Sequence, residues 1–178
     1  MTPDPTQDEQ PPADAPDAFR GVNPVLRDAM TRRGFTELTT VQRAVLDAAS
    51  RGANLRISSQ TGSGKTVAIG MALADELIER LHAGVKGEPR PGPLALIVCP
   101  TRELAAQVRS ELSWLYADIE RLFIAVVTGG TDIGRERKLL ARRPAIVVGT
   151  PGRLLDHVRA GALRLAATEH VILDEADQ

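Results

Sequence analysis

A glycine-rich segment about one third of the way along the chain has the residue types that bind phosphate. It follows a short strand-like run at 54–58 and opens a helical pattern. Glycines let backbone N–H groups curl around a phosphate, and a helix start turns its positive dipole end toward the anion. A lysine there supplies charge for terminal phosphates, and the next hydroxyl suits Mg²⁺. The predicted phosphate-binding residues are Ser59, Gln60, Thr61, Gly62, Ser63, Gly64, Lys65 and Thr66.

This segment departs from the general G-x-x-x-x-G-K-[ST] pattern because Ser59 stands at the first glycine position. A Gly-Lys-Thr turn alone would also fit an ordinary loop at the start of a helix. The strand-like run before it and the helical pattern after it favour the phosphate site.

A second group of reactive side chains, Asp174-Glu175-Ala176-Asp177, follows the short apolar run 171–173. Neighbouring side chains on a strand point in opposite directions, but the backbone turns where a strand ends. Asp174 and Glu175 can therefore both face the phosphates. The alternative is a solvated acidic loop.

Three further loops carry groups that can bond phosphate oxygens, and each follows a predicted strand. They are residues 100–105, Gly129-Gly130 and residues 150–153. Arginines, hydroxyls and helix-start N–H groups can hold a sugar-phosphate backbone without reading bases. The two threonines also suit simpler roles, as a helix N-cap and as part of a Thr-Pro helix entry. The candidate phosphate-contacting residues of these loops are Thr101, Arg102, Gly129, Gly130, Thr150, Gly152 and Arg153.

Strands and helices are predicted to alternate along the chain. Asn23 caps a helix that begins at Pro24 and ends near Gly34, and a second helix covers 41–49. Leucines and isoleucines at i+4 spacing continue the helix behind the phosphate loop. Further helices are expected at 104–115, 133–140 and 153–159, and strands at 94–99, 123–127, 145–148 and 171–173. This order predicts an α/β fold in which helices cover both faces of a parallel sheet, with ligands at the carboxyl ends of the strands.

Composition adds limits on the class of protein. The 178 residues suit one domain, and 43% of them are hydrophobic. Residues 1–18 hold five acids and no Lys or Arg, so this Pro-rich segment is expected to be a disordered tail and the rest of the chain carries a net charge of +4. That mild charge does not by itself indicate nucleic-acid binding. Aromatic residues make up only 3% of the chain, so base stacking is not expected.

The cellular setting also follows from composition. Cys99 is the single cysteine and lies in an apolar run, so a buried reduced thiol is expected. No run is long enough to span a membrane, and the first residues lack the pattern of a secretory signal. The predicted location is the cytoplasm.

The motifs, taken in order, resemble those of the DEAD-box RNA helicases from Phe19 to Asp177. The resemblance implies that residues 19–178 form the first RecA-like lobe, a P-loop fold that is incomplete at its C-terminal end. It also implies ATP and Mg²⁺ as cofactors and RNA as a partner, held through its backbone without sequence preference.

The resemblance further implies roles for individual residues. Phe35 and Gln42 correspond to the adenine-reading segment, although residues 39–42 also fit a helix capping box. Leu38 and Thr40 stand where the family usually has prolines. Lys65, Asp174 and Glu175 are the implied catalytic residues. Thr66 and Asp174 are the implied Mg²⁺ ligands, Asp174 through water.

The family's second lobe, its Ser-Ala-Thr motif and its arginine fingers have no counterpart after Gln178. The chain alone is therefore expected to bind ATP or ADP weakly and not to unwind RNA. In the family, the strand after the terminal motif lies between the phosphate-loop strand and the Asp174 strand, so a gap is expected there. Two alternatives stay open: a non-catalytic ATP- or RNA-binding module, if 178 residues are the whole product, and a related ATPase acting on DNA.

Overall fold

A computed structural model describes residues 18–49, 51–52, 54–58, 60, 62–83 and 90–175. Most of the tail predicted at 1–18 lies outside the described residues. Four residues of the predicted motifs lie outside them as well: Ser59, Thr61, Ala176 and Asp177.

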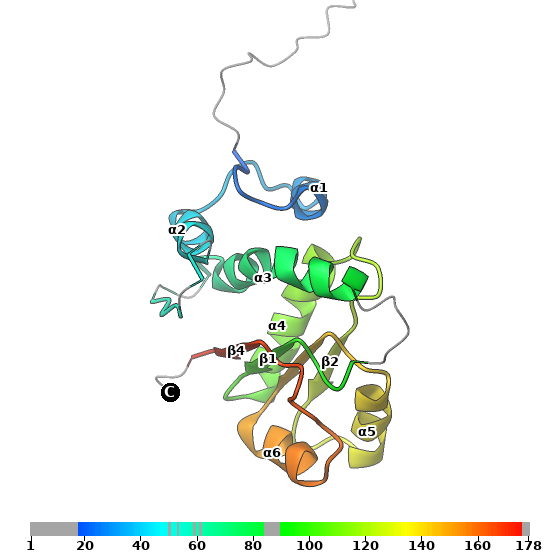
Figure 1. Cartoon of the computed structure of the whole chain (residues 1–178). Helices are drawn as coiled ribbons and strands as arrows, with labels where there is room; N and C mark the ends of the chain where they lie inside the picture. The colour runs from blue at the N-terminus through cyan, green and yellow to red at the C-terminus, as the bar shows by residue number, and fades with distance from the viewer. Residues whose placement is uncertain are drawn as a thin grey trace, which may run out of the picture.

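Four parallel strands form the sheet, in the order β2-β3-β1-β4 (Figure 1). They are β1 (Ala95–Val98), β2 (Ile124–Val127), β3 (Ile146–Gly149) and β4 (His170–Leu173). Each agrees with a predicted strand to within about two residues, and the parallel α/β fold is confirmed. Because all four strands run the same way, the loops that follow them meet at one edge of the sheet.

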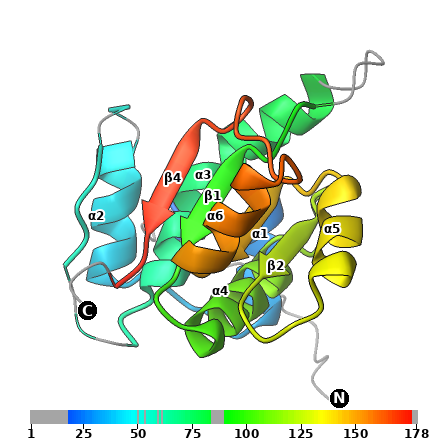
Figure 2. The ribbon, with the colours of Figure 1, turned by 90° about the horizontal axis from the view of Figure 1, so that it is seen from below.

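Helices cover the sheet on both faces, as predicted (Figure 2). One face and its helices share a large apolar cluster that includes Leu77, Ile97 and Leu112. The opposite face packs Leu96 and Val147 in a second cluster. The helices are α1 (Pro24–Arg32), α2 (Thr40–Ala49), α3 (Lys65–Ala83), α4 (Arg102–Leu115), α5 (Ile133–Ala141) and α6 (Pro151–Arg159).

Local signals in the sequence define the helix ends. The Asn23 side chain accepts a hydrogen bond from the Val25 N–H at 3.0 Å, and Pro24 occupies the first turn of α1. Gly34 follows the helix with a φ of +85°, a left-handed conformation that glycine adopts without strain. The predicted boundaries of α1 are therefore confirmed. Among the described residues, no helix is both long and apolar enough to cross a membrane.

The strand predicted at 54–58 is not observed. These residues have no regular structure, and all except Ile57 are exposed. A strand requires a paired neighbour. Within the described residues, β4 pairs only with β1, and residues 54–58 pair with no strand of the sheet. The exposure of β4 agrees with this result, because its side chains Val171 and Leu173 are 62% and 64% exposed.

Candidate functional site

The phosphate loop has the backbone that its glycines predict. Gly62 and Gly64 have φ angles of +79° and +83°, which other residues rarely adopt. Helix α3 begins at Lys65, directly after the loop, and the Ala68 N–H donates to the Gly64 carbonyl at 2.9 Å. The positive end of the helix dipole and Lys65, the first residue of the helix, thus both directly follow the loop, which suits a phosphate.

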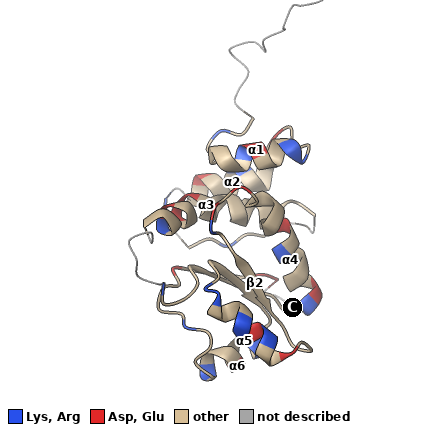
Figure 3. Cartoon of the chain, turned by 90° about the vertical axis from the view of Figure 1, so that its right-hand side faces the viewer, with Lys and Arg blue, Asp and Glu red and all other residues tan. Residues whose placement is uncertain are grey.

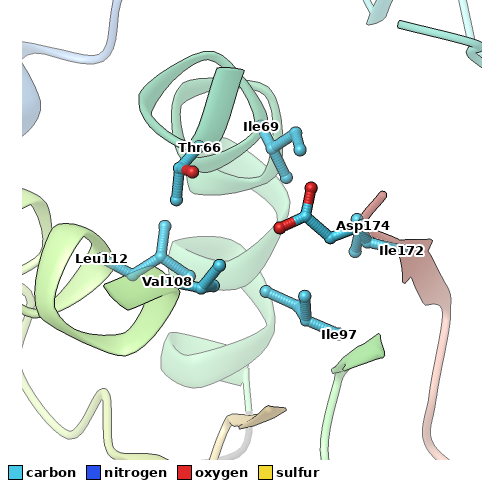
Figure 4. A pocket seen from close by; sticks show the side chains of 7 residues that line it. All are labelled: Thr66, Ile69, Ile97, Val108, Leu112, Ile172 and Asp174. Carbon is cyan, nitrogen blue, oxygen red and sulfur yellow. The ribbon is translucent and has the colours of Figure 1, made fainter. Parts of the chain in front are cut away.

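Thr66 and Asp174 lie 108 positions apart in the sequence but line the same small cavity (Figure 4). The rest of its wall is apolar and comes from the helices and strands next to it, including Ile97 of β1 and Leu112 of α4. A hydroxyl and a carboxylate are the oxygen ligands that Mg²⁺ prefers. The two predicted metal ligands are therefore brought together, and their chemistry fits the ion.

The backbone turns immediately after β4, as predicted for the two acids. The Asp174 N–H still donates to the Val98 carbonyl at 2.9 Å, as in the sheet. Glu175 then has a φ of +49°, which is unusual for a residue other than glycine. Backbone strain of this kind is often found at functional sites.

Cys99 directly follows β1 and is fully buried. Burial, together with the negative charges of Asp174 and Glu175, raises the pKa of its thiol to about 12. The predicted burial of the thiol is confirmed. A thiol with so high a pKa is a poor nucleophile at neutral pH.

Gln42 is buried, with 1% of its surface exposed, and it completes a capping box. The Thr39 N–H donates to Gln42 Oε1 at 2.9 Å, and the Gln42 N–H donates to Thr39 Oγ1 at 3.3 Å. The Thr39 hydroxyl also donates to the Ser63 carbonyl of the phosphate loop at 3.1 Å. A Cβ on Gly64 would lie 2.5 Å from Gln42 Nε2, so the Gln42 amide lies against the loop.

Phe35 has a different environment from Gln42. Its ring packs against Trp114 of α4, with the ring centroids 5.6 Å apart and the planes tilted by 31°. The Arg33 guanidinium lies over the same indole ring, 5.4 Å from its centroid. The structure therefore places Gln42 at the phosphate loop and Phe35 against α4.

The candidate RNA loops meet at the carboxyl edge of the sheet, and Arg102 joins two of them. Its Nη1 donates to the Gly129 carbonyl at 3.4 Å, and 58% of its side chain is exposed. Gly130 has a φ of +84°, and a Cβ at this position would overlap Arg102 Nη1. The backbone angle thus favours glycine at position 130, whereas the end of the exposed Arg102 side chain is able to shift away from a Cβ.

The two threonines of these loops differ in their use of the hydroxyl. Thr101 Oγ1 accepts from the Leu104 N–H at 3.2 Å, which confirms the predicted N-cap. Thr150 occupies the N-cap position of α6, but its side chain makes no capping hydrogen bond there. Pro151 supplies the helix entry instead. Gly152 lies in the first turn of α6, with open space where a Cβ would stand.

Arg153 points mainly into the protein, and only 14% of its side chain is exposed. Its Nη1 lies 3.3 Å from Glu136 Oε2, and its Nη2 donates to the Thr131 carbonyl at 3.3 Å. Glu136 Oε2 also lies 2.7 Å from His157 Nε2. Glu136 Oε1 accepts from the Thr128 N–H at 2.9 Å and from the Thr131 hydroxyl.

Burial alone would raise the pKa of Glu136. Hydrogen bonds from Thr131, His157 and Thr128, and then the charge of Arg153, outweigh burial and lower the pKa below its ordinary value. The sequence analysis missed Glu136, His157 and Thr131. In the sequence Glu136 stands among basic residues of α5, the helix on which Figure 3 shows several Lys and Arg residues, and such a charged run is typical of a solvated surface. For Thr131, the signal in the sequence was its position directly after the candidate loop residues Gly129 and Gly130.

Comparison with known proteins identifies the motifs. The family model described as DEAD/DEAH box helicase matches residues 39–178. A DEAD-box ATP-dependent RNA helicase 9 of Oryza sativa subsp. japonica is 39% identical over 158 residues, covering 89% of this chain and 24% of that protein. The DEAD-box ATP-dependent RNA helicase CshA of Bacillus cereus is 38% identical over the same share of this chain and 28% of its own length.

A solved structure extends the similarity to the fold. The crystal structure of a hypothetical ATP-dependent RNA helicase from Sulfolobus tokodaii matches with a TM-score of 0.73 and 34% identity. The match covers 87% of this chain and 42% of that chain. The fold is thus the RecA-like fold of a helicase domain. The chain spans about a quarter of the length of the curated relatives described above. With its phosphate loop, acidic turn and matching family model, the chain belongs to the DEAD/DEAH box helicase family.

Proposed function

We propose that residues 19–178 are the ATP-binding lobe of an ATP-dependent RNA helicase. The observation that carries the proposal is the shared cavity of Thr66 and Asp174, next to the phosphate loop and the start of α3. Lys65 would hold the terminal phosphates, and Thr66 and Asp174 would hold Mg²⁺. When bound, the ion would neutralise charge on the phosphate oxygens.

For the reaction itself we assign Glu175 to the attacking water. Its backbone turn places it next to Asp174, beyond the end of β4. A carboxylate at this position can orient the water and accept its proton. Gln42 would read adenine with its amide, since a carboxamide offers both a donor and an acceptor, and Phe35 would cover the ring.

The second part of the proposal is RNA binding at the neighbouring loops. Thr101, Arg102, Gly129, Gly130, Thr150, Gly152 and Arg153 all lie after strands at the carboxyl edge of the sheet. Arg102 is the exposed charge of this set, and the start of α6 offers N–H groups beside Thr150. Contacts of this kind bind phosphates in any sequence and weaken with salt.

We further propose that this chain alone binds nucleotide far better than it hydrolyses it. Arginine fingers change the rate of phosphoryl transfer by about 10³ to 10⁵, and in the helicases that this chain resembles they come from a second lobe. Duplex unwinding by these 178 residues alone is not expected.

A thermal melt of the purified chain with saturating Mg-ADP tests the nucleotide site. We expect ADP to raise the melting temperature and Mg-GDP to leave it unchanged, because a ligand at 100 times its Kd adds about 2.7 kcal/mol to the free energy of unfolding. Lys65→Ala should abolish the shift, and Lys138→Ala, an exposed lysine on α5, should retain it. An ADP shift that survives in Lys65→Ala would contradict the assignment.

A further inference from the structure

One carboxylate links two of the loops that we assign to RNA. Glu136, on α5, accepts hydrogen bonds from Thr128 and Thr131, which flank Gly129 and Gly130. The same carboxylate pairs with Arg153 and His157 of α6, the helix that follows its N-cap residue Thr150. Arg153 also contacts the first loop directly, because its Nη2 donates to the Thr131 carbonyl.

These groups are almost entirely removed from water. The side chains of Glu136 and His157 are 4% and 0% exposed, and that of Arg153 is 14% exposed. Buried charged groups retain fixed positions, because a displaced partner leaves the other without compensation. His157 Nδ1 has no hydrogen-bond partner among the described residues, so the tautomer protonated at Nε2, which donates to Glu136, fits this site.

From this network we infer that Glu136 is a positioning residue for RNA, which holds the Gly129–Thr131 loop and the start of α6 in one fixed geometry. The inference rests on the proposed function and revises one part of it. Arg153 supports the loops from inside the protein and does not itself contact phosphate, because Glu136 neutralises its charge and its Nη1 and Nη2 bond groups inside the protein. Backbone groups of Gly129, Gly130 and Gly152, together with Arg102, then make the contacts to phosphate.

Two explanations of the role of Glu136 predict opposite effects of Glu136→Gln on the affinity for RNA. If the residue acted only through its charge, its removal would favour a polyanion, and RNA binding would tighten. If the residue positions the loops, RNA binding weakens although a negative charge is lost. The matched control is Glu120→Gln, which removes the same charge from an exposed side chain.

The experiment measures binding of a fluorescently labelled single-stranded oligouridylate to the 178-residue chain. We expect Glu136→Gln to weaken the Kd about tenfold, as for loss of a charge-assisted hydrogen bond, and Glu120→Gln to leave it unchanged or slightly tighter. Thr131→Val is a milder second variant, because it removes the hydroxyl that contacts Glu136 Oε1 and the Thr128 carbonyl and leaves the Glu136 and Arg153 side chains themselves unaltered. Unchanged or tighter binding by both Glu136→Gln and Thr131→Val would overturn the inference.

The role of Arg153 is tested by the salt dependence. A residue that neutralises a phosphate lowers the slope of log Kd against log salt by about 0.7 when it is removed. Arg102→Ala should show this change, and Arg153→Ala should weaken binding with the slope retained. The double variant with Glu136→Gln should bind no more weakly than Arg153→Ala alone. A reduced slope for Arg153→Ala, or additive losses in the double variant, would refute the positioning role.

Hydrogen exchange measures the same network without RNA. In Glu136→Gln, amide exchange should quicken together at 128–131 and at 152–154, about tenfold, while β1 exchanges as before. If the unmodified chain binds no RNA, the proposed RNA site fails, and this measurement alone decides whether Glu136 joins the loops. Exchange that changes in one loop only, or in neither, would show that it does not.

Discussion

Thr39 and Gln42 form a capping box that also lies against the phosphate loop. Their reciprocal hydrogen bonds begin α2, and the Thr39 hydroxyl reaches the Ser63 carbonyl of the phosphate loop. Gln42 Oε1 has two lone pairs, of which the Thr39 N–H uses one, and the amide nitrogen lies beside Gly64. Capping and adenine recognition are therefore compatible, and the structure requires no choice between them.

The lowered pKa of Glu136 leads to a prediction about the stability of the fold at acid pH. Its pKa is lower in the folded protein than the ordinary value of 4.5, so the unfolded chain takes up the proton first as the pH falls. The stability from Glu136 is thus present above about pH 4.5 and is lost as the pH falls through the folded pKa. We expect Glu136→Gln to be less stable at pH 7 and to lose less stability than the unmodified chain below pH 5.

Urea unfolding at pH 7, 5, 4 and 3.5 measures this difference. Glu120→Gln is again the control and should lose stability with the same pH dependence as the unmodified chain, because that side chain is exposed. Parallel curves for Glu136→Gln and the unmodified chain would mean that the network does not lower the pKa of this carboxyl group.

Helices and strands were the part of the structure most accessible from the sequence. Apolar runs predicted all four strands, although only β1, β2 and β3 are largely buried between helices, where strands are apolar throughout, and β4 is partly exposed. Caps such as Asn23 and Thr101 predicted helix starts, because their hydrogen bonds are local. The strand predicted at 54–58 was wrong, because a strand needs a paired neighbouring strand and the local sequence does not reveal whether one is present. Glu136 was missed because its burial comes from α6, in another part of the chain.

The packing of α3 on α4 depends on Gly70. A Cβ there would lie 2.5 Å from Leu115 Cδ2 and 2.9 Å from Leu112 Cδ2, and both leucines are fully buried. The Tyr116 hydroxyl donates to the Gly70 carbonyl at 2.7 Å, which holds the helices close. Glycine thus allows an approach that alanine would obstruct.

We expect Gly70→Ala to lower the free energy of unfolding by about 1–2 kcal/mol, since overpacking exceeds the helix propensity that alanine adds. Gly152→Ala is the matched control: it places the same methyl group in a helix with open space around it, and its stability should be unchanged or slightly higher. Urea denaturation of the two variants gives both values. A stabilised Gly70→Ala would show that the leucines move aside at little cost.

The distribution of charge over the chain bears on the proposed binding of RNA. The net charge is −1, but five acids lie within residues 1–18 and the remaining residues carry +4. Basic residues on α5 and Arg102 belong to that positive part. Fields of this kind act over a Debye length, which is about 10 Å at 0.1 M salt and about 3 Å at 1 M. The acidic segment should therefore oppose a polyanion mainly at low salt.

Replacing Asp4, Asp8, Glu9, Asp14 and Asp17 by the corresponding amides changes the net charge of the chain from −1 to +4. We expect this variant to bind oligouridylate several-fold more tightly at 50 mM salt and as the unmodified chain does at 0.5 M, since screening removes the difference. The shift of the melting temperature by Mg-ADP should stay the same, because these acids are not among the proposed nucleotide ligands. A gain in RNA affinity that persists at 0.5 M salt would instead indicate that the acidic segment occupies the RNA site directly and excludes RNA by contact.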